Sequence, residues 1–230
     1  KGTFGTALIV AGSINYTGAA FLAGSAAYRS GAGLVTMAVP EPLHSILAGQ
    51  LPEATWILLP HDMGNISGNA AEALTMSLEG ATALLVGPGI GTEEKTREFL
   101  ENLLMGKSKS KKQTSQIDFV QSEALKEEHN NALPPMVVDA DGLNLLAKIS
   151  DWHKKLPALS VLTPHPGEMA VLTGLSKDEI QNDREAIAAG EIRGRHRQRN
   201  FQVFKGAALQ HLAEEPRHAV VARESVARKR

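Results

Sequence analysis

Apolar residues gather in short runs that alternate with longer amphipathic stretches along the first part of the chain. Thr6–Ala11 is a β-branched run that ends at Gly12-Ser13, which predicts a buried strand followed by a turn. Gly18–Tyr28 is rich in alanine and long enough for a helix, and Gly33–Val39 is a second strand-like run that Pro40 stops. A strand, a helix and a strand within about forty residues predict a parallel βαβ unit.

The same alternation returns further along the chain. The predicted helices are Asn69–Glu79, Glu93–Met105 and Leu143–Ile149, and the predicted strands are Ala83–Val86, Met136–Val138 and Leu159–Leu162. On the second of these helices, one face carries Phe99, Leu100, Leu103 and Leu104. We therefore expect an open α/β fold. Because ligands of such folds bind outside the carboxyl ends of the strands, the turns that end the strands are where chemistry is expected.

The alternation breaks down between Gly106 and Pro134. A polar, basic run, GKSKSKKQTSQ, is followed by an acidic helix candidate at Val120–His129. We interpret residues 106–134 as a solvated surface insertion. A nucleic-acid or phosphate patch is the alternative, but the run has no interleaved aromatic residues on which bases would stack.

Composition excludes several classes of protein. The 230 residues carry a formal net charge of −1 and include no cysteine, which excludes a disulfide scaffold, a thiolate zinc site and a cysteine nucleophile. An apolar fraction of 43% excludes bulk disorder, and the balanced charge gives no reason to expect nucleic-acid binding. No segment approaches the ~20 apolar residues of a membrane span. Since Lys1 precedes a strand directly, without a signal peptide or an initiator Met, we expect a cytoplasmic domain cut from a longer chain.

Two glycine-containing turns follow predicted strands. Gly12-Ser13, together with Thr17–Ala20, places small residues where backbone N–H groups could approach a phosphate or ribose. Tight packing of the strand against the helix explains these small residues equally well. Gly87–Gly91, with the sequence G-P-G-I-G, predicts a turn that is rigid yet open to a ligand. Its glycine spacing is not that of the dinucleotide fingerprint, and alone it identifies no ligand.

Two further turns carry ionisable side chains. Asp139 and Asp141 follow a predicted strand directly, so these carboxylates could hold Mg²⁺ through water or cap the following helix. Leu162–Glu168, with the sequence L-T-P-H-P-G-E, surrounds one imidazole and one carboxylate with two prolines and a glycine. Such strict local specification favours a functional site over a simple connecting turn.

Taken in order, these segments resemble the ADP/ATP-dependent NAD(P)H-hydrate dehydratases, a branch of the ribokinase-like superfamily. The resemblance covers about residues 1–184 apart from the insertion, and rests on Lys1–Ser13, Thr17–Ala20, Arg29–Val35, Gly87–Gly91, Val138–Asn144 and Leu162–Glu168. It implies a ribokinase-like α/β fold with a mostly parallel central sheet flanked by helices on both faces. It also implies a carbon–oxygen lyase that restores NADH or NADPH from the (S)-hydrate at the expense of ADP or ATP.

The resemblance further assigns ligand contacts to particular residues. Ala20, Gly89 and His165 would contact the hydrated nicotinamide cofactor. Lys205-Gly206-Ala207 resembles the family's K-G-A segment, whose backbone and lysine meet the nucleotide. Phosphorylation of the substrate hydroxyl would turn a poor leaving group into a good one, so the reaction uses the geometry of a kinase for an elimination.

Metal and partner expectations follow from the same resemblance. Glu168 matches a carboxylate that organises magnesium and phosphate, and Asp139 and Asn144 would line the same cleft. Glu168 and Asp139 are therefore the predicted Mg²⁺ residues. The expected partners are the small-molecule hydrates NADHX and NADPHX, with neither nucleic acid nor membrane. Family members often assemble as homo-oligomers, so a homo-oligomer is the assembly that the resemblance suggests.

The chain departs from the family after the K-G-A segment. The family continues to a G-[ST]-G-D turn whose Asp is the catalytic base, whereas Ala208–Arg230 contains no glycine, so no catalytic residue is assigned. Residues 190–230 carry ten basic and four acidic side chains, which leaves a net charge of −7 on the first 189. We therefore divide the chain into a dehydratase domain at 1–189 and an Arg-rich, atypical tail at 190–230.

Three interpretations of this tail compete. The leading hypothesis is a shift of the reading frame near Ala189, so that the C-terminal part of the fold is atypical or missing. A basic tail that binds nucleic acid or an acidic partner is the second, and a solvated, partly helical C-terminus is the third. For the whole chain, the alternatives to an active dehydratase are a catalytically impaired fragment that only binds ligand and a related small-molecule kinase.

Overall fold

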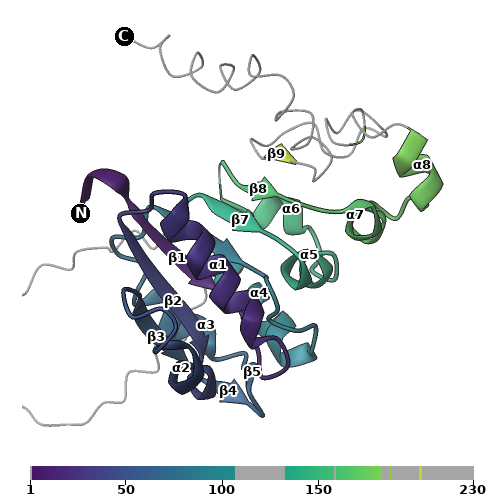
Figure 1. Cartoon of the computed structure of the whole chain (residues 1–230). Coiled ribbons are helices and arrows are strands. Elements are labelled where there is room, and N and C mark those ends of the chain that lie inside the picture. The colour runs from purple at the N-terminus through teal and green to yellow at the C-terminus, as the bar shows by residue number, and fades with distance from the viewer. Residues whose placement is uncertain (1, 107–132, 158, 183–186, 188–201, 204–230) are drawn as a thin grey trace, which may run out of the picture.

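The structure, a computed structural model, describes residues 2–106, 133–157, 159–182, 187 and 202–203 (Figure 1). Most of the predicted insertion at 106–134 lies outside the described residues. So does the tail at 190–230 apart from Gln202–Val203, and with it the predicted nucleotide segment Lys205, Gly206 and Ala207. In the described part of the chain, no helix has the length and apolar character needed to cross a membrane.

Within the described residues, seven parallel strands form the central sheet, in the spatial order β3-β2-β1-β6-β7-β8-β9. Their bounds are β1 Thr6–Val10, β2 Leu34–Pro40, β3 Thr55–Leu59, β6 Ala83–Val86, β7 Met136–Val138, β8 Val161–Leu162 and β9 Gln202–Val203. Val10, Val86, Val138 and Leu162 stand in one row of the register. Because all neighbouring strands run in the same direction, the turns after these four residues start side by side at one edge of the sheet.

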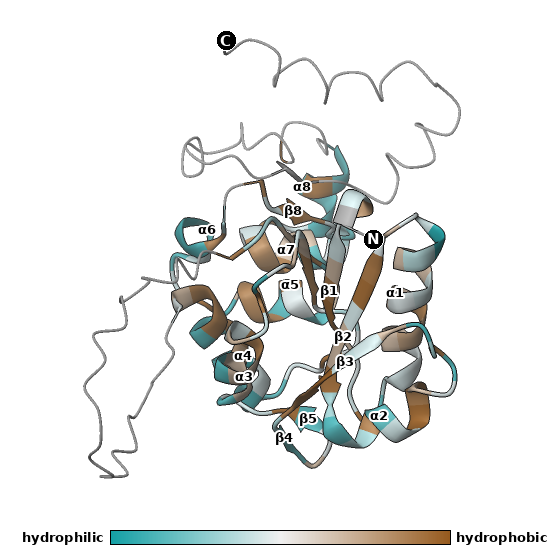
Figure 2. Cartoon of the chain, turned by 90° about the vertical axis from the view of Figure 1, so that its left-hand side faces the viewer, coloured by the Kyte–Doolittle hydropathy of each residue, from teal (hydrophilic) through white to brown (hydrophobic). Residues whose placement is uncertain are grey.

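Helices cover both faces of this sheet, as Figures 1 and 2 show. The helices are α1 Thr17–Arg29, α2 Glu41–Leu47, α3 Ala70–Thr75, α4 Glu94–Met105, α5 Asp141–Leu146, α6 Trp152–Lys155, α7 Pro166–Thr173 and α8 Lys177–Asn182, preceded by a 3-10 turn at Gly2–Phe4. A short antiparallel hairpin, β4 His61–Asp62 and β5 Asn65–Ile66, follows β3.

The two faces of the sheet have separate hydrophobic cores because successive strand residues point to opposite sides. Leu8 and Val10 of β1 pack in a cluster with residues of α3, α4 and α5. Ile9 and Ala11 pack in a second cluster with residues of α1 and α2. In Figure 2 the brown, apolar strands accordingly lie between the two groups of helices. The predicted mostly parallel sheet with helices on both faces is confirmed.

Most of the predicted elements are present with small changes of boundary. The strands at Ala83–Val86 and Met136–Val138 are found as predicted, and the apolar face of α4 is buried. The helix predicted at Asn69–Glu79 is too long, because after Thr75 the chain continues with turn-type bonds such as Ser77 N–H to the Leu74 carbonyl.

Other segments differ from the prediction, and β3, α6, α7 and α8 were not predicted. The helix predicted at Leu143–Ile149 begins earlier, at Asp141, and ends at Leu146. The strand predicted from Leu159 begins only at Val161, since Leu159 has a φ of +64° that a strand does not allow. Helix α2 was not predicted, although Pro42 lies in its first turn, where the missing N–H of proline has no helical acceptor to lose.

Candidate active site

The four predicted turns lie together at the carboxyl edge of the sheet. They flank the point at which the helices that follow adjacent strands change from one face of the sheet to the other. From β1 the chain passes to α1 on one face, and from β6 it passes to α4 on the other face. Adjacent parallel strands whose following helices diverge in this way form the topological switch point at which open α/β proteins bind ligands. The turns after β1 and β6 lie on either side of that point.

The turn after β1 is packed tightly against the first turn of α1. Gly12 has a φ of +83°, and a Cβ added to it would lie 2.9 Å from the methyl carbon of Ala20. Ala20 is fully buried. In this structure its side chain packs beneath Gly12 and is not exposed to solvent. The predicted contact of Ala20 with the hydrate therefore stays a prediction.

The turn after β6 lies directly against the turn after β1. Gly12 N–H donates to the Pro88 carbonyl at 2.8 Å. A Cβ added to Gly89 would lie 2.6 Å from the Ala19 methyl carbon and 2.8 Å from the Cβ of Tyr16, and φ at Gly89 is +65°. Only glycine allows this approach. The structure thus brings the predicted substrate residue Gly89 against the start of α1.

The turns after β6 and β7 touch backbone to backbone. A Cβ added to Gly87, where φ is +133°, would lie 1.9 Å from the carbonyl oxygen of Asp139. A Cβ added to Gly142 would lie 2.9 Å from the Cα of Gly87. Neither glycine was singled out individually from the sequence. The absence of a side chain at both positions is what allows the second and third turns to adjoin.

The carboxylates of Asp139 and Asp141 accept hydrogen bonds from different partners, although the two residues are only two positions apart. The Asp139 carboxylate accepts a hydrogen bond from the Thr163 hydroxyl at 2.7 Å, which joins the turn after β7 to the turn after β8. The Asp141 carboxylate accepts from Gly91 N–H at 3.0 Å, which joins it to the turn after β6. The interpretation that these acids cap the following helix is wrong, because the N-cap is Ala140 and no side chain caps α5.

Ala140 adopts an unfavourable backbone conformation between these two acids. Its φ of 50° and ψ of −121° are those of the first central residue in a type II′ turn, where glycine is preferred. Gly142 N–H closes the turn on the Asp139 carbonyl at 3.0 Å. An alanine in this region costs of order 1 kcal/mol, which the surrounding contacts must offset.

The turn after β8 is built from its own residues. His165 is the N-cap of α7, and its Nδ1 accepts hydrogen bonds from Gly167 N–H at 2.9 Å and Glu168 N–H at 3.2 Å. In return, His165 N–H donates to the Glu168 carboxylate at 2.8 Å, which completes a capping box. Since Nδ1 is an acceptor, these bonds assign the imidazole proton to Nε2. The side chain of His165 is 67% exposed, and its Nε2 lies 3.4 Å from Oε1 of Glu168.

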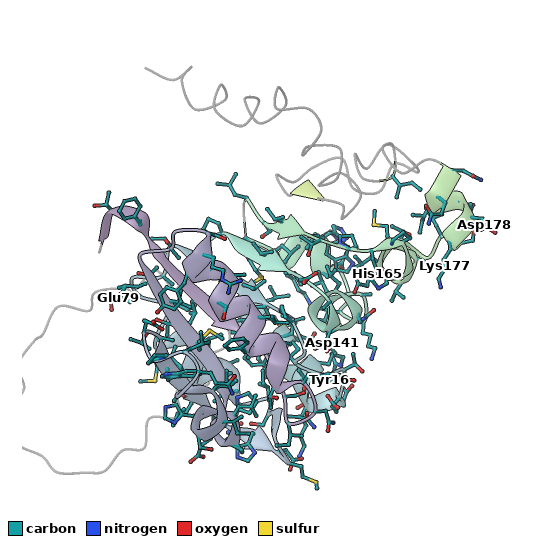
Figure 3. The ribbon with its side chains drawn as sticks, viewed as in Figure 1. Tyr16, Glu79, Asp141, His165, Lys177 and Asp178 are labelled. Atoms are coloured by element: carbon teal, nitrogen blue, oxygen red, sulfur yellow. The ribbon has the colours of Figure 1, made fainter. Side chains whose placement is uncertain are left out.

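Figure 3 places Tyr16, Asp141 and His165 one after another along this edge. The three residues come from the turns after β1, β7 and β8. Tyr16 has an exposed ring on a backbone that its neighbours hold, because its N–H donates to the Ser13 carbonyl and its carbonyl accepts from Ala19 N–H. The site therefore has a fixed backbone floor with a few exposed polar and aromatic side chains.

The hairpin β4–β5 stands next to the first turn. Ile14 N–H donates to the Gly64 carbonyl at 3.0 Å, and Asp62 pairs with Lys95 at the start of α4. The hydrogen bond from Lys95 lowers the pKa of the Asp62 carboxyl, and Asp62 in turn raises the pKa of Lys95. Both groups are exposed, so this pair fixes the position of the hairpin more than it adds stability.

A hollow of about 440 Å³ lies between the starts of α3 and α4. It is lined by Ser67, Gly68, Asn69, Ala71, Glu72, Lys95, Glu98 and Asn102. No residue predicted to bind the hydrate, the nucleotide or the metal lines it. The predicted contacts instead gather around the four turns.

The predicted magnesium residues are placed close to the site but are already engaged. Glu168 is largely buried; its Oε2 accepts from His165 N–H, and its Oε1 lies 3.4 Å from His165 Nε2. Asp139 accepts from Thr163, and Asn144 lies on α5. Among the residues that the structure describes, no group of three or more His, Asp or Glu side chains could hold a metal ion.

Comparisons with known proteins identify the family of this chain. A family model described as NAD(P)H-hydrate dehydratase matches residues 7–194. The bifunctional NAD(P)H-hydrate repair enzyme of Moorella thermoacetica is 37% identical over 194 residues, which cover 82% of this chain and 31% of that enzyme. The chain thus spans about a third of the length of the curated relatives it matches.

Solved structures give the same result for the fold. An ADP/ATP-dependent NAD(P)H-hydrate dehydratase from Bacillus subtilis, crystallised with ATP and Mg²⁺ and soaked with CoA, is 27% identical with a TM-score of 0.55. The match covers 83% of this chain and 56% of the Bacillus chain. A ribokinase-like superfamily protein from Enterococcus faecalis, 20% identical with a TM-score of 0.57 over 87% of this chain and 63% of its own, supports the fold alone. The predicted ribokinase-like fold is confirmed.

Proposed function

The chain belongs to the NAD(P)H-hydrate dehydratase family, and from this premise we propose that it uses ADP or ATP to convert (S)-NAD(P)H-hydrate into NAD(P)H. The observation that carries the proposal is the meeting of four turns at the switch point of the sheet. These turns contain the segments by which the sequence resembles the family, including Gly87–Gly91 and Leu162–Glu168.

The proposed reaction replaces the hydroxyl of the hydrated ring by a carbon–carbon double bond. The hydroxyl releases its proton to solvent, its oxygen attacks the terminal phosphorus of the nucleotide, and the bond between that phosphorus and the bridging oxygen breaks, which leaves AMP from ADP or ADP from ATP. The ring carbon–oxygen bond then breaks and releases phosphate, while the neighbouring carbon loses a proton. A phosphate leaves far more readily than hydroxide, so the nucleotide supplies the driving force.

The described residues would bind and orient the hydrate in this reaction. Gly89 allows the turn after β6 to lie directly against the start of α1, and the buried Ala20 packs against Gly12 beneath it. The exposed imidazole of His165 would contact the hydrate, and the capping box fixes the direction of its ring. Lys205-Gly206-Ala207 would hold the nucleotide by resemblance, and this segment lies outside the described residues.

The described residues do not form a protein-held magnesium site. The oxygens of Glu168 face His165, and no third acidic or imidazole ligand joins Asp139 and Glu168 in the described part of the chain. Magnesium that accompanies a nucleotide is commonly held by the phosphates, waters and one or two carboxylates. We therefore derive no step through a metal and keep Asp139 and Glu168 as predicted ligands only.

The test is a turnover assay with the protein as it stands. NADH-hydrate is incubated with the protein, Mg²⁺ and either ADP or ATP, and the return of the dihydronicotinamide absorbance is followed. We expect nucleotide-dependent recovery that is absent without nucleotide and unchanged in Asp178→Ala, a change on the exposed face of α8. No recovery with either nucleotide would contradict the proposed activity of this chain.

A ligand-binding fragment without turnover is the second candidate, and one observation favours it. The G-[ST]-G-D turn that supplies the family's catalytic base does not occur between Ala208 and Arg230. Loss of a general base and its anion hole typically lowers a rate by several orders of magnitude. Calorimetric binding of NADH-hydrate without recovery of absorbance would identify this case. Nucleotide hydrolysis or phosphorylation of another small alcohol would identify a related kinase.

Three further properties are proposed with the function. We infer a cytoplasmic location, because the proposed substrates are intracellular cofactors, and a homo-oligomer, because family members often assemble so. We also infer a dehydratase domain at 1–189 with an atypical tail at 190–230. Cell fractionation, sedimentation and sequencing of the coding DNA beyond codon 189 test these inferences in turn.

A further inference from the structure

We propose that Asp141 is a positioning residue that holds the turn Gly87–Gly91 in the shape that accepts the hydrated nicotinamide. The proposal rests on the proposed function, since Gly89 in this turn is the predicted substrate contact. Asp141 itself has no predicted contact with the hydrate, the nucleotide or the metal. Its role would be exerted entirely through Gly91.

The contact between Asp141 and Gly91 joins residues that are fifty positions apart in the sequence. The Asp141 carboxylate accepts from Gly91 N–H at 3.0 Å, and Gly91 is buried. An acidic side chain at the first position of a helix ordinarily faces the free N–H groups of its own helix. Asp141 is the first residue of α5, yet its side chain caps no group there. Its carboxylate instead accepts a hydrogen bond from the neighbouring turn, Gly87–Gly91.

The backbone before Asp141 is held in a conformation that brings the chain to this position. Ala140 has the φ and ψ of a type II′ turn, which are unfavourable for alanine. Unfavourable backbone conformations persist where surrounding contacts impose them, and they occur preferentially at functional sites. Here Gly142 against Gly87 and the Thr163 hydroxyl on Asp139 supply those contacts on either side. The strain at Ala140 is therefore maintained by the same turns that Asp141 connects.

Without Asp141, the hydrogen bonds that join the turn Gly87–Gly91 to other described segments would all lie on its β1 side, and packing alone would hold it toward β7. Toward β1, it is fixed by Gly12 N–H donating to the Pro88 carbonyl and by Gly87 N–H donating to the Val10 carbonyl. Toward β7, Asp141 holds the last residue of the turn. Gly89 lies between these two attachments. Loss of the second attachment frees the part of the turn that bears the predicted substrate contact.

The experiment compares Asp141→Ala with Asp141→Asn, which keeps a side-chain oxygen that can accept from Gly91 N–H. Asp178→Ala, on the exposed surface of α8, controls for the loss of one negative charge. Hydrogen exchange of the Gly91 amide is measured by NMR, and affinity for NADH-hydrate is measured by calorimetry. Both are recorded at a temperature at which thermal unfolding curves show every variant to be folded.

In Asp141→Ala we expect exchange of the Gly91 amide and the Kd for NADH-hydrate each to rise about tenfold, as loss of a charged acceptor for a buried N–H predicts. In Asp141→Asn and Asp178→Ala we expect both to stay within about threefold of the wild type. If the effect of Asp141→Ala came from the loss of charge alone, Asp141→Asn would show the same effect. Normal behaviour of the asparagine variant therefore points to the hydrogen bond.

Three outcomes would overturn the proposal, and they are distinguishable. Unchanged exchange at Gly91 in Asp141→Ala would show that the bond does not hold the turn. Faster exchange with unchanged affinity would show that the turn is held but that its shape does not matter for the hydrate. Absence of hydrate binding by the wild-type protein would overturn the proposed function itself, and the positioning role would fall with it.

Discussion

The turns after β1, β6 and β7 differ from the turn after β8 in what determines their shape. The first three are joined across the sheet by backbone contacts, such as Gly12 N–H on the Pro88 carbonyl and Gly87 against Asp139. The turn after β8 is determined mainly by five consecutive residues, Pro164–Glu168, whose side chains and backbone satisfy one another. Thr163 joins it to the end of β7, through its N–H and hydroxyl on the Val138 carbonyl, and to the turn after β7, through its hydroxyl on Asp139.

This difference separates two ways of building one site. A shape imposed by neighbours from distant parts of the chain is lost in several turns at once when one contact fails. A shape encoded by a short segment is lost alone. The three joined turns should therefore respond to substitution together, whereas the β8 turn should respond by itself.

The largest effect is expected for Gly87→Ala. The added carbon would meet the Asp139 carbonyl at a distance no real contact allows, at a φ that disfavours alanine. We expect a loss of about 3 kcal/mol or more in the free energy of unfolding, measured by urea titration. The matched control is Gly18→Ala in α1, where an added carbon meets nothing and should stabilise the helix by a few tenths of a kcal/mol up to about 1.

Gly87→Ala also tests whether the three turns form one unit. Amide exchange at Gly12, Gly91 and Gly142 should accelerate together in this variant, while exchange at Gly167 should not change. Equal acceleration at Gly167 would break the distinction between the joined turns and the β8 turn.

A smaller and local effect is expected for His165→Ala. Two N–H groups at the start of α7 lose their acceptor, which lowers the free energy of unfolding by about 1 kcal/mol, in the usual range for a lost N-cap. His165→Asn keeps a capping oxygen, so thermal unfolding should be close to that of the wild type, yet hydrate affinity should fall as far as in His165→Ala. An asparagine variant that binds the hydrate normally would contradict the predicted contact of the imidazole.

The smallest effect, with the opposite sign, is expected for Ala140→Gly. Glycine relieves the positive φ at this position and loses more entropy on folding, so we expect a net gain of about 0.5 kcal/mol by urea titration. The control is Ala73→Gly in α3, where the backbone is helical and the same substitution should destabilise by about 1 kcal/mol. A loss of stability in Ala140→Gly would show that the turn after β7 is not strained.

The sequence predicted the site better where the structure is local. The segment Leu162–Glu168 was recognised from its prolines, glycine, imidazole and carboxylate. The structure shows that its residues fix their own shape, through the capping box between His165 and Glu168. Strands β1, β2, β6 and β7 and helix α4 were predicted for the same reason, because their apolar patterns lie within a few residues. What the segment does locally, a capping box that employs Glu168, was not predicted, since the resemblance assigned that carboxylate to magnesium and phosphate.

Non-local features could not be predicted in the same way. Asp139 and Asp141 look equivalent in the sequence, and only the register of β6, β7 and β8 places Thr163 beside one and Gly91 beside the other. The need for glycine at position 87 arises from a carbonyl fifty-two residues later. A single sequence reveals the glycine but not what approaches it.

The end of α4 has a consequence for how this chain tolerates change in length. Gly106 closes α4 with a left-handed cap, and β7 begins at Met136. In a parallel sheet both positions lie at the amino edge, opposite the four turns. This is accordingly where a reporter domain could be inserted, or new chain termini opened, without displacing the turns of the site.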